Sequence, residues 1–195
     1  PDPEWNIPGS LTDGSLPVYH FMQHRTRGEG FFLCLLQKPE GASREPSLRP
    51  FKTDSSVPAE CRRWLAPSSD YEFFIKGDSI YALPAALASV MNHVNQELYT
   101  LLPGIEVAVR KGRDWVPAHA LAMSDALDRT AFHEVELTRR QALDYLHCDA
   151  LRLDDTTRGI VLVTYNGVPL GFVKNLGNRA NNMYPQEWRI RISVS

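Results

Sequence analysis

The stretch RGIVLVTYNGVPLGFVK, residues 158–174, decides the fold of the C-terminal part of this chain. It contains two apolar runs rich in Val, Ile and Leu, and Val and Ile in particular favour strands. Between the runs lie Asn166 and Gly167, which both tolerate the positive φ that a two-residue hairpin turn requires. The stretch therefore predicts a β-hairpin whose first strand is strongly apolar.

The segments on either side of this hairpin predict further small elements. Residues 132–137, FHEVEL, are expected to form a strand. Thr138 is a suitable N-cap for a helix over residues 139–146, because its hydroxyl can accept a hydrogen bond from an unpaired backbone N–H. Residues 175–185 are expected to form a loop, and EWRIRISV, residues 187–194, alternates as a final strand.

The central part of the chain predicts two more hairpins and a helix between them. Residues 71–84 and 105–118 each contain two short strand-like runs around a Lys-Gly dipeptide. Apolar residues recur at helical spacing over residues 85–98, and Pro84 suits the first turn of that helix. Residues 119–127 predict a short helix. This mixture predicts an α+β fold built from mixed small sheets with short helices.

The N-terminal part predicts a hairpin of its own, followed by a linker. Residues 18–37 contain two strand-like runs joined by a polar segment with two glycines. The second run, Phe31–Leu36, is apolar on both faces, as in a strand that is covered on both sides. Residues 39–69 carry five prolines and several serines, a composition typical of a linker.

The predicted division therefore has four parts. Residues 1–38 form a terminal hairpin and residues 39–69 a linker. Residues 70–128 form a small α+β domain, and residues 129–195 form a β-rich C-terminal domain.

The composition is that of an ordinary soluble protein, with 195 residues, 43% hydrophobic content and a formal net charge of -2. Total charge therefore gives no support for nucleic-acid binding. Cys34, Cys61 and Cys148 form no CxxC pair, which argues against a disulfide framework or a thiolate zinc site and fits a reducing, cytoplasmic setting. His20 and His24 lie in a strand-to-loop region, so no metal site is expected. No apolar stretch approaches the roughly 20 residues that a membrane helix needs.

Three local clusters nevertheless place basic side chains together, two of them beside aromatic groups. They are His24, Arg25 and Arg27; Arg110, Lys111 and Arg113 with Trp115; and Lys174, Arg179, Arg189 and Arg191 with Tyr184, Trp188 and several Asn. Arg and Lys neutralise phosphates, while Asn and aromatic groups bond to or stack on unpaired bases. The competing interpretation is that the arginines form a solvated, protected sheet edge and that Trp188 belongs to the core.

Two of these stretches resemble a known family. HRTRGEGFFLCLLQK, residues 24–38, resembles the closing hairpin of the catalytic domain in Nop/Sun-type RNA methyltransferases. PLGFVKNLGNRANNMYPQEWRIR, residues 169–191, is similar to the C-terminal PUA-like RNA-binding region of the RsmF-like bacterial branch of that family. Residues 70–128 look like the extra domain that precedes it. The resemblance thus implies that residues 129–195 are a PUA-like domain.

The resemblance also implies a chemistry for the larger protein. It would transfer a methyl group from S-adenosylmethionine to C5 of a cytosine in structured RNA, expected to be ribosomal RNA. In this family the reactive cysteine and its partner lie in or near motifs in which proline precedes cysteine. The three cysteines here follow Leu33, Glu60 and His147, and no GxGxxG motif is present. No catalytic residue and no cofactor site are therefore assigned to this segment, and its partner would be a catalytic domain outside this chain.

The expected RNA contacts follow from the resemblance and from the basic clusters. They are Lys174, Asn175, Arg179, Asn181, Tyr184 and Arg189, with Arg25 and Arg27 near the mouth of the catalytic site. Two alternatives remain open at this point. The C-terminal region could pack on the methyltransferase domain or another protein without touching RNA, or the chain could be an enzyme in itself that uses Cys148 or the histidines.

Overall fold

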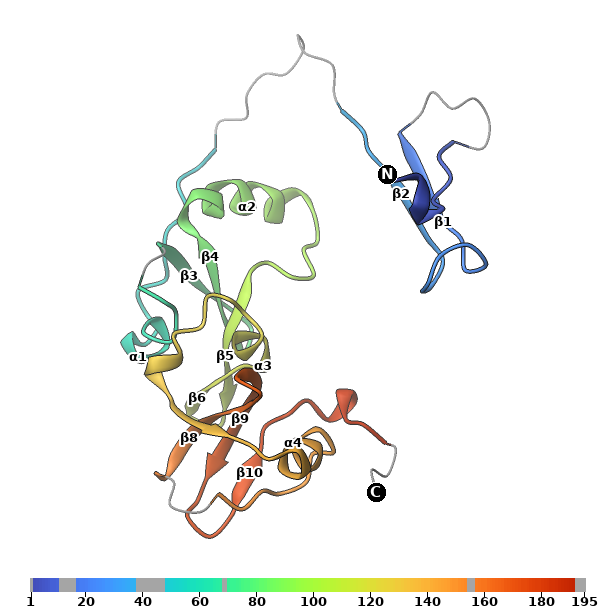
Figure 1. The fold of residues 1–195 in the computed structure, drawn as a ribbon. Helices are drawn as coiled ribbons and strands as arrows, with labels where there is room; N and C mark the ends of the chain where they lie inside the picture. The colour runs from blue at the N-terminus through green and yellow to red at the C-terminus, as the bar shows by residue number, and fades with distance from the viewer. Residues whose placement is uncertain (1, 11–16, 38–47, 68–69, 154–156, 192–195) are drawn as a thin grey trace. The chain divides into compact units, whose positions relative to one another are not determined.

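The computed structural model describes residues 2–10, 17–37, 48–67, 70–153 and 157–191. The chain forms two units, Pro1–Ser47 and Leu48–Ser195, and each is described by itself (Figure 1). None of the helices within these ranges is long and apolar enough to span a membrane.

The first unit contains the predicted hairpin. A 3-10 turn, η1 (Pro3–Trp5), precedes β1 (Val18–Phe21) and β2 (Phe31–Cys34), which pair antiparallel. The expectation that the second strand is covered on both faces is wrong within this unit, because Phe31 is 62% exposed and Phe32 is 55% exposed. Two strands alone have no second layer to bury them.

The second unit contains two four-stranded sheets, and the first is antiparallel throughout. Its strands are β3 (Tyr71–Lys76), β4 (Ser79–Pro84), β5 (Ile105–Lys111) and β6 (Asp114–Pro117), in that order. Both predicted turns are confirmed, with φ of 61° at Gly77 and 66° at Gly112. The helix α2 (Ala85–Glu97) connects β4 to β5.

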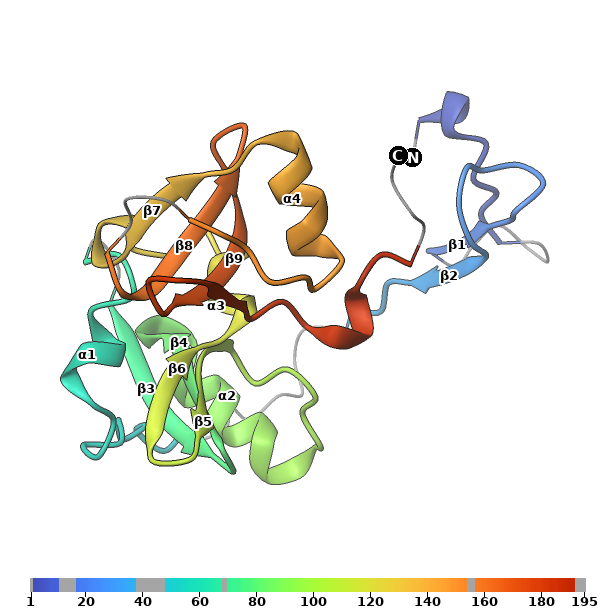
Figure 2. The ribbon, with the colours of Figure 1, turned by 90° about the horizontal axis from the view of Figure 1, so that it is seen from below.

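The second sheet is built on the hairpin of residues 158–174. Its strands are β7 (His133–Glu136), β8 (Gly159–Tyr165), β9 (Val168–Asn175) and β10 (Ala180–Asn182), in the order β10-β9-β8-β7. The turn has φ of 51° at Asn166 and 74° at Gly167. β7 runs parallel to β8, so the chain must cross over between them, and α4 (Arg139–Leu146) lies in that crossover (Figure 2). Thr138 caps α4 in a reciprocal capping box with Gln141.

One hydrophobic core joins the two sheets. It contains Phe73 and Ile80 from the first sheet together with Leu162 and Phe172 from the second. The short helix α3 (His119–Ala122) contacts both β5 and β9. Residues on both sides of the predicted boundary near residue 128 therefore share this interior, while a second core cluster that includes Leu137, Tyr145 and Val173 lies within the C-terminal part.

Part of the predicted linker is also in this core, which corrects the interpretation of residues 39–69. The helix α1 (Ala59–Arg62) carries Cys61, and Cys61, Trp64 and Leu65 are all buried. The backbone N–H of Asp54 donates to the carbonyl of Phe73 at 2.7 Å. Prolines mark irregular backbone but do not prevent the apolar residues between them from packing. Residues 38–47 and 68–69 lie outside the described ranges.

Two further expectations differ from the structure. Residues 187–191 form no strand; η3 (Gln186–Trp188) is a 3-10 turn, and β10 instead arises within the predicted loop. On α2, only Ala88 is buried, while Leu87 and Val90 are exposed. Helical spacing therefore identified the helix but not the depth of its packing.

Candidate nucleic-acid interface

The β9–β10 ladder presents two of the expected RNA contacts side by side. Lys174 lies directly opposite Asn181 in the antiparallel register, and both side chains are exposed. Opposite residues of an antiparallel pair project from the same face. Exposed Arg179 lies in the connection between the strands, where the N–H of Leu176 donates to its carbonyl at 2.9 Å. This strand end therefore offers two cations and an amide to solvent.

Asn175 does not belong to this exposed set, which corrects the prediction for that residue. It is 2% exposed. Its Nδ2 donates to the carbonyl of Thr157 at 3.2 Å, and its Oδ1 accepts the N–H of Gly177 at 2.9 Å. The side chain therefore builds the β9–β10 connection instead of facing a ligand. Asn residues often stabilise turns in this way.

Tyr184 is held in place by Asn182, one of the asparagines of the C-terminal cluster that was not among the expected RNA contacts. The Asn182 Nδ2 donates to the carbonyls of Tyr145 at 2.8 Å and Asp149 at 3.0 Å, while its Oδ1 accepts the Tyr184 N–H at 2.8 Å. This amide fastens the segment after β10 to the end of α4. Tyr184 is consequently half-buried.

Four aromatic side chains form a row from the interior to the surface. Ring centroids are 5.4 Å apart for Tyr145 and Tyr184, 5.1 Å for Tyr184 and His119, and 5.3 Å for His119 and Trp188. All three pairs are edge-to-face, an arrangement that aromatic rings prefer. Tyr145 is fully buried and Trp188 is 58% exposed. The interpretation of Trp188 as a core residue is therefore wrong, because the 3-10 turn η3 presents it to solvent.

His119 belongs to this row, although sequence reasoning did not assign it to the site. Its Nδ1 is buried and has no hydrogen-bond partner in the described part of the chain. Burial lowers the pKa of the imidazole below its ordinary value of 6.5, so the ring is neutral at pH 7. No local motif marks His119, since its neighbours in the row are distant in sequence.

Gly171 on β9 makes room for this row. Its φ is +143°, and a Cβ at this position would collide with the Tyr145 hydroxyl and lie 3.0 Å from the His119 Nδ1. The Tyr145 hydroxyl itself donates to the carbonyl of Phe172 at 3.3 Å. Glycine therefore permits the close approach of β9, α4 and α3 beneath the exposed rings.

Two adjoining hollows connect the exposed cations with the exposed rings. The first, of about 200 Å³, is lined by Lys111, Asp114, Val116, Lys174, Asn181, Asn182 and Met183. The second, of about 370 Å³, shares Lys111, Val116 and Met183 with the first and extends to His119, Glu187 and Trp188. We call the two hollows together the β6–β10 groove. It brings the basic tip of the β5–β6 hairpin to the C-terminal basic cluster, although the two are far apart in sequence.

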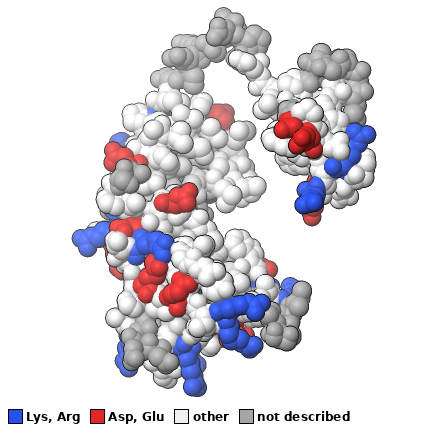
Figure 3. Space-filling view, in the orientation of Figure 1, with Lys and Arg blue, Asp and Glu red and all other residues white. Residues whose placement is uncertain are grey.

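The charges around the groove are mixed. Figure 3 shows Lys and Arg over the end of the second unit that holds β9, β10 and α4, while Asp and Glu are more frequent in the middle of the face. Arg189 follows Trp188 and is exposed. The Arg110 guanidinium lies 4.5 Å from the centre of the Trp115 ring, so these two side chains form a cation–π contact.

Arg25 and Arg27 lie in the first unit, on the connection between β1 and β2. Both are exposed, and their part in RNA contact stays a prediction. Cys148 shows no sign of activation. Its Sγ lies 3.8 Å from the carbonyl oxygen of Tyr184, and burial raises the pKa of the thiol, which disfavours the thiolate. Among the described residues, no three His, Cys, Asp or Glu side chains are placed to hold a metal ion.

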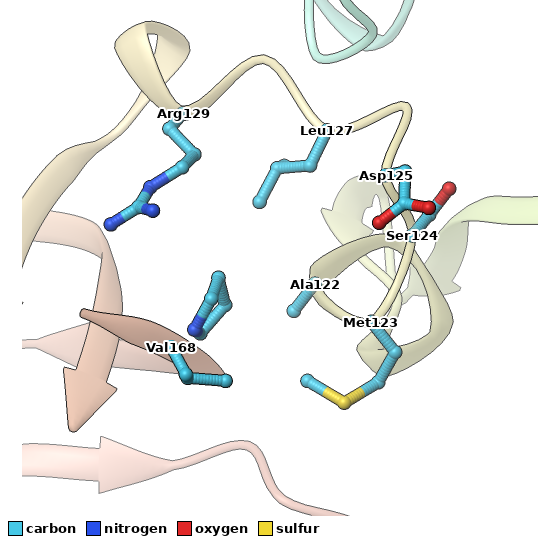
Figure 4. Close-up of a pocket in the computed structure, with 8 residues that line it drawn as sticks. Ala122, Met123, Ser124, Asp125, Leu127, Arg129 and Val168 are labelled. Atoms are coloured by element: carbon cyan, nitrogen blue, oxygen red, sulfur yellow. The ribbon is translucent and has the colours of Figure 1, made fainter. Parts of the chain in front are cut away.

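A further hollow shares no lining residue with the β6–β10 groove (Figure 4). It has a volume of about 380 Å³ and is lined by Ala122, Met123, Ser124, Asp125, Leu127, Arg129, Val168 and Pro169. Met123 is 50% exposed and Val168 is 60% exposed. The Arg129 guanidinium already has partners within the protein, since it pairs with Glu134 and donates to the carbonyl of Gly167 at 3.2 Å. This hollow therefore combines exposed apolar side chains with the carboxylate of Asp125, and its one cation already has an acidic partner.

Comparison with known proteins connects the groove to a family. Residues 132–190 match the family described as the methyltransferase RsmF PUA domain. The chain is 27% identical over 173 residues to the ribosomal RNA small subunit methyltransferase F of Aliivibrio fischeri strain MJ11, covering 82% of this chain and 35% of that protein. It is 26% identical over 173 residues to the protein of the same name from Shewanella oneidensis, with the same coverage.

The chain thus spans about a third of the length of the curated relatives it matches. The matched domain includes β7 to β10 and α4, and with them Lys174, Asn181 and Trp188 of the groove. The family resemblance that the sequence motifs predicted is confirmed, as is the α+β fold. The chain is therefore similar to the ribosomal RNA small subunit methyltransferases F, and its residues 132–190 match the PUA domain of that family.

Proposed function

We propose that the second unit binds structured RNA through the β6–β10 groove. It would do so as the RNA-recognition region of an S-adenosylmethionine-dependent methyltransferase that modifies C5 of a cytosine in ribosomal RNA. The observation that carries this proposal is the meeting of Lys111, Lys174 and Asn181 with exposed Trp188 along one groove. These side chains supply the chemistry that unpaired RNA requires, because lysines neutralise phosphates and aromatic rings stack on bases.

The methyl-transfer chemistry is assigned to a part of the protein outside this chain. None of the three cysteines follows a proline, and no glycine-rich nucleotide cradle is present. We therefore propose no S-adenosylmethionine site among the residues of this chain. The role proposed for this region is to hold and orient RNA.

The test replaces two phosphate-binding candidates. In the variant Lys174→Ala/Arg179→Ala, affinity for a structured ribosomal RNA fragment is expected to fall, and the slope of log affinity against log salt to decrease by about 1.4 to 1.8 in magnitude, depending on strandedness. Fluorescence anisotropy across a salt series measures both. The control Lys52→Ala/Arg63→Ala removes the same charge at exposed positions outside the groove. An unchanged affinity and slope in the first variant, or equal changes in both, would contradict the proposal.

A second candidate function is docking on another protein, in the simplest case the methyltransferase region itself. The hollow of Figure 4 favours it, since Met123 and Val168 expose large apolar side chains there, beside an Arg129 that already pairs with Glu134. This candidate predicts that Val168→Lys weakens association of the chain with the methyltransferase region while leaving RNA affinity unchanged. A binding measurement between the two purified parts decides it.

A further inference from the structure

The larger hollow of the groove differs in chemistry from the smaller one. The smaller hollow carries two lysines, Lys111 and Lys174, against a single carboxylate, Asp114. The larger one contains Lys111 only at its shared end, and its other charged residues are the carboxylates Glu106 and Glu187. A phosphate would be repelled by these carboxylates, whereas a neutral heterocycle with hydrogen-bond donors would not. The larger hollow therefore suits a different part of the RNA from the smaller one.

The two carboxylates differ in whether they already accept hydrogen bonds within the protein. The Oε1 of Glu106 accepts a hydrogen bond from the Ser79 hydroxyl at 2.6 Å, so part of its capacity is used within the protein. Glu187 is exposed and has no hydrogen-bond or ion-pair partner among the described residues. A carboxylate accepts hydrogen bonds from the exocyclic amino group of a base, as Asp and Glu do from cytosine. Glu187 is thus available to an amino-bearing ligand.

His119 and Trp188 both line this hollow, where their rings meet edge to face with centroids 5.3 Å apart. Trp188 is 58% exposed, although a tryptophan more often buries most of its ring. No hydrogen bond joins His119 Nδ1 to any residue in the described ranges, and burial lowers the pKa of the imidazole so that it adds no positive charge. A volume of about 370 Å³ lies within the range of small-molecule sites. The hollow can therefore accept a flat ring beside Trp188.

We infer that the larger hollow binds one unpaired nucleobase of the RNA, stacked on Trp188, and prefers a base that carries an exocyclic amino group over uracil. The inference rests on the RNA-binding function proposed above and specifies which part of the RNA enters which hollow. Lys111 and Lys174 hold the neighbouring phosphates in the smaller hollow. The base enters beside Trp188, and Glu187 accepts its amino group.

The experiment compares three RNAs that share one stem: a hairpin with a loop of cytosines, a hairpin with an equally long loop of uracils, and the blunt duplex. Wild type is expected to bind the cytosine loop more tightly than the uracil loop. For Trp188→Ala, the loss of affinity for the cytosine loop is expected to exceed the loss for the duplex by about tenfold, the order of one stacked base. Trp188→Phe, which keeps a stacking ring, is expected to recover most of that loss.

Glu187→Gln is expected to reduce the preference for cytosine over uracil while keeping the preference for loop over duplex. An equal loss for loop and duplex in Trp188→Ala overturns the base site, and equal affinity of wild type for the two loops overturns the amino preference. Circular dichroism verifies that the variants are folded. Failure of wild type to bind any of the three RNAs would instead refute the proposed function, so the two failures are distinguishable.

Discussion

The hairpins β1–β2 and β8–β9 are alike in apolar character and pairing but differ in burial. Each contains an antiparallel pair of apolar strands joined through a glycine at positive φ. Phe31 is 62% exposed in the first, whereas Phe172 is 1% exposed in the second. The second hairpin has β7 and β10 on its two edges and the shared core beneath it. An apolar run therefore specifies a strand, while burial depends on the layers that the rest of the fold supplies.

The largest expected effect comes from truncating one phenylalanine in each hairpin. Phe172→Ala is expected to lower the free energy of unfolding of the second unit by about 3–5 kcal/mol, because it removes a buried ring and leaves a cavity. Phe32→Ala, at a 55% exposed position, is expected to change that of the first unit by less than about 0.5 kcal/mol. Urea denaturation followed by circular dichroism measures both. Equal losses of unfolding free energy in the two variants would contradict the difference in burial between the hairpins.

A second pair of variants compares the glycines of the two hairpins. Gly171→Ala is expected to cost about 1–3 kcal/mol or more, because it combines a strained φ with a collision at the Tyr145 hydroxyl. Gly28 has φ of +126°, and a Cβ added there would meet no atom within 4 Å. Gly28→Ala therefore incurs strain without a clash, and a smaller cost is expected. Thermal unfolding of the two variants makes the comparison, which fails if Gly28→Ala is the more damaging.

Loss of the α4 capping box is expected to lower stability by a smaller amount, and it tests the helix that packs beside β8. Thr138→Ala removes the side-chain acceptor for the Gln141 N–H, and a loss of about 1 kcal/mol is expected. Thr138→Ser keeps a hydroxyl and should retain most of the stability. A chemical denaturation midpoint that is unchanged in the alanine variant would show that the helix does not depend on this cap.

The smallest effect concerns pH and the turn of β8–β9. The Glu136 carboxylate accepts hydrogen bonds from the Thr164 hydroxyl at 2.6 Å and from the backbone N–H groups of Gly167 and Asn166. The Thr164 bond is the main cause that holds the pKa of Glu136 below its ordinary value of 4.5. The unfolded chain therefore binds the proton more readily, and stability is lost as pH falls from about 4.5 through the lower folded pKa.

Melting temperatures measured between pH 7 and pH 3 test this dependence. The stability difference between wild type and Glu136→Gln is expected to be largest near pH 7 and to shrink at the acid end. Glu29→Gln, on the β1–β2 connection, serves as the matched removal of one exposed carboxylate. If both variants follow wild type with the same offset at every pH, the carboxylate does not stabilise the turn.

The parts of the fold that sequence predicted are those with local chemical signals. Asn166-Gly167, the two Lys-Gly turns and Thr138 each act within a few residues, and all formed as expected. The packing of Trp64 was not predicted, because the surrounding prolines describe backbone shape and carry no information about a distant partner. Its ring lies 5.6 Å from that of Phe132, a contact made only in the finished fold.

At the candidate site, too, the sequence carried no signal for features that depend on packing between distant residues. Exposure of Lys174, Arg179 and Asn181 is compatible with the predicted contacts, and their binding role stays a prediction. The prediction for Asn175 failed because sequence alone does not distinguish an Asn that stabilises a turn from an Asn that contacts a ligand. His119 was missed because its relation to Trp188 exists only through the packing of α3 beside β9.

The shared core has a consequence for how the protein is made. Trp64 and Phe73 pack with Leu162 and Phe172, so the early strands cannot complete their interior until the last hairpin leaves the ribosome. At synthesis rates of about 5–20 residues per second, the wait for these roughly 100 residues is about 5 to 20 seconds. Once β6 has been made, the nascent β3–β6 sheet presents an unfinished apolar face for the rest of that interval. Folding should therefore be slow and late, and a chaperone that shields this face would raise the yield of native protein.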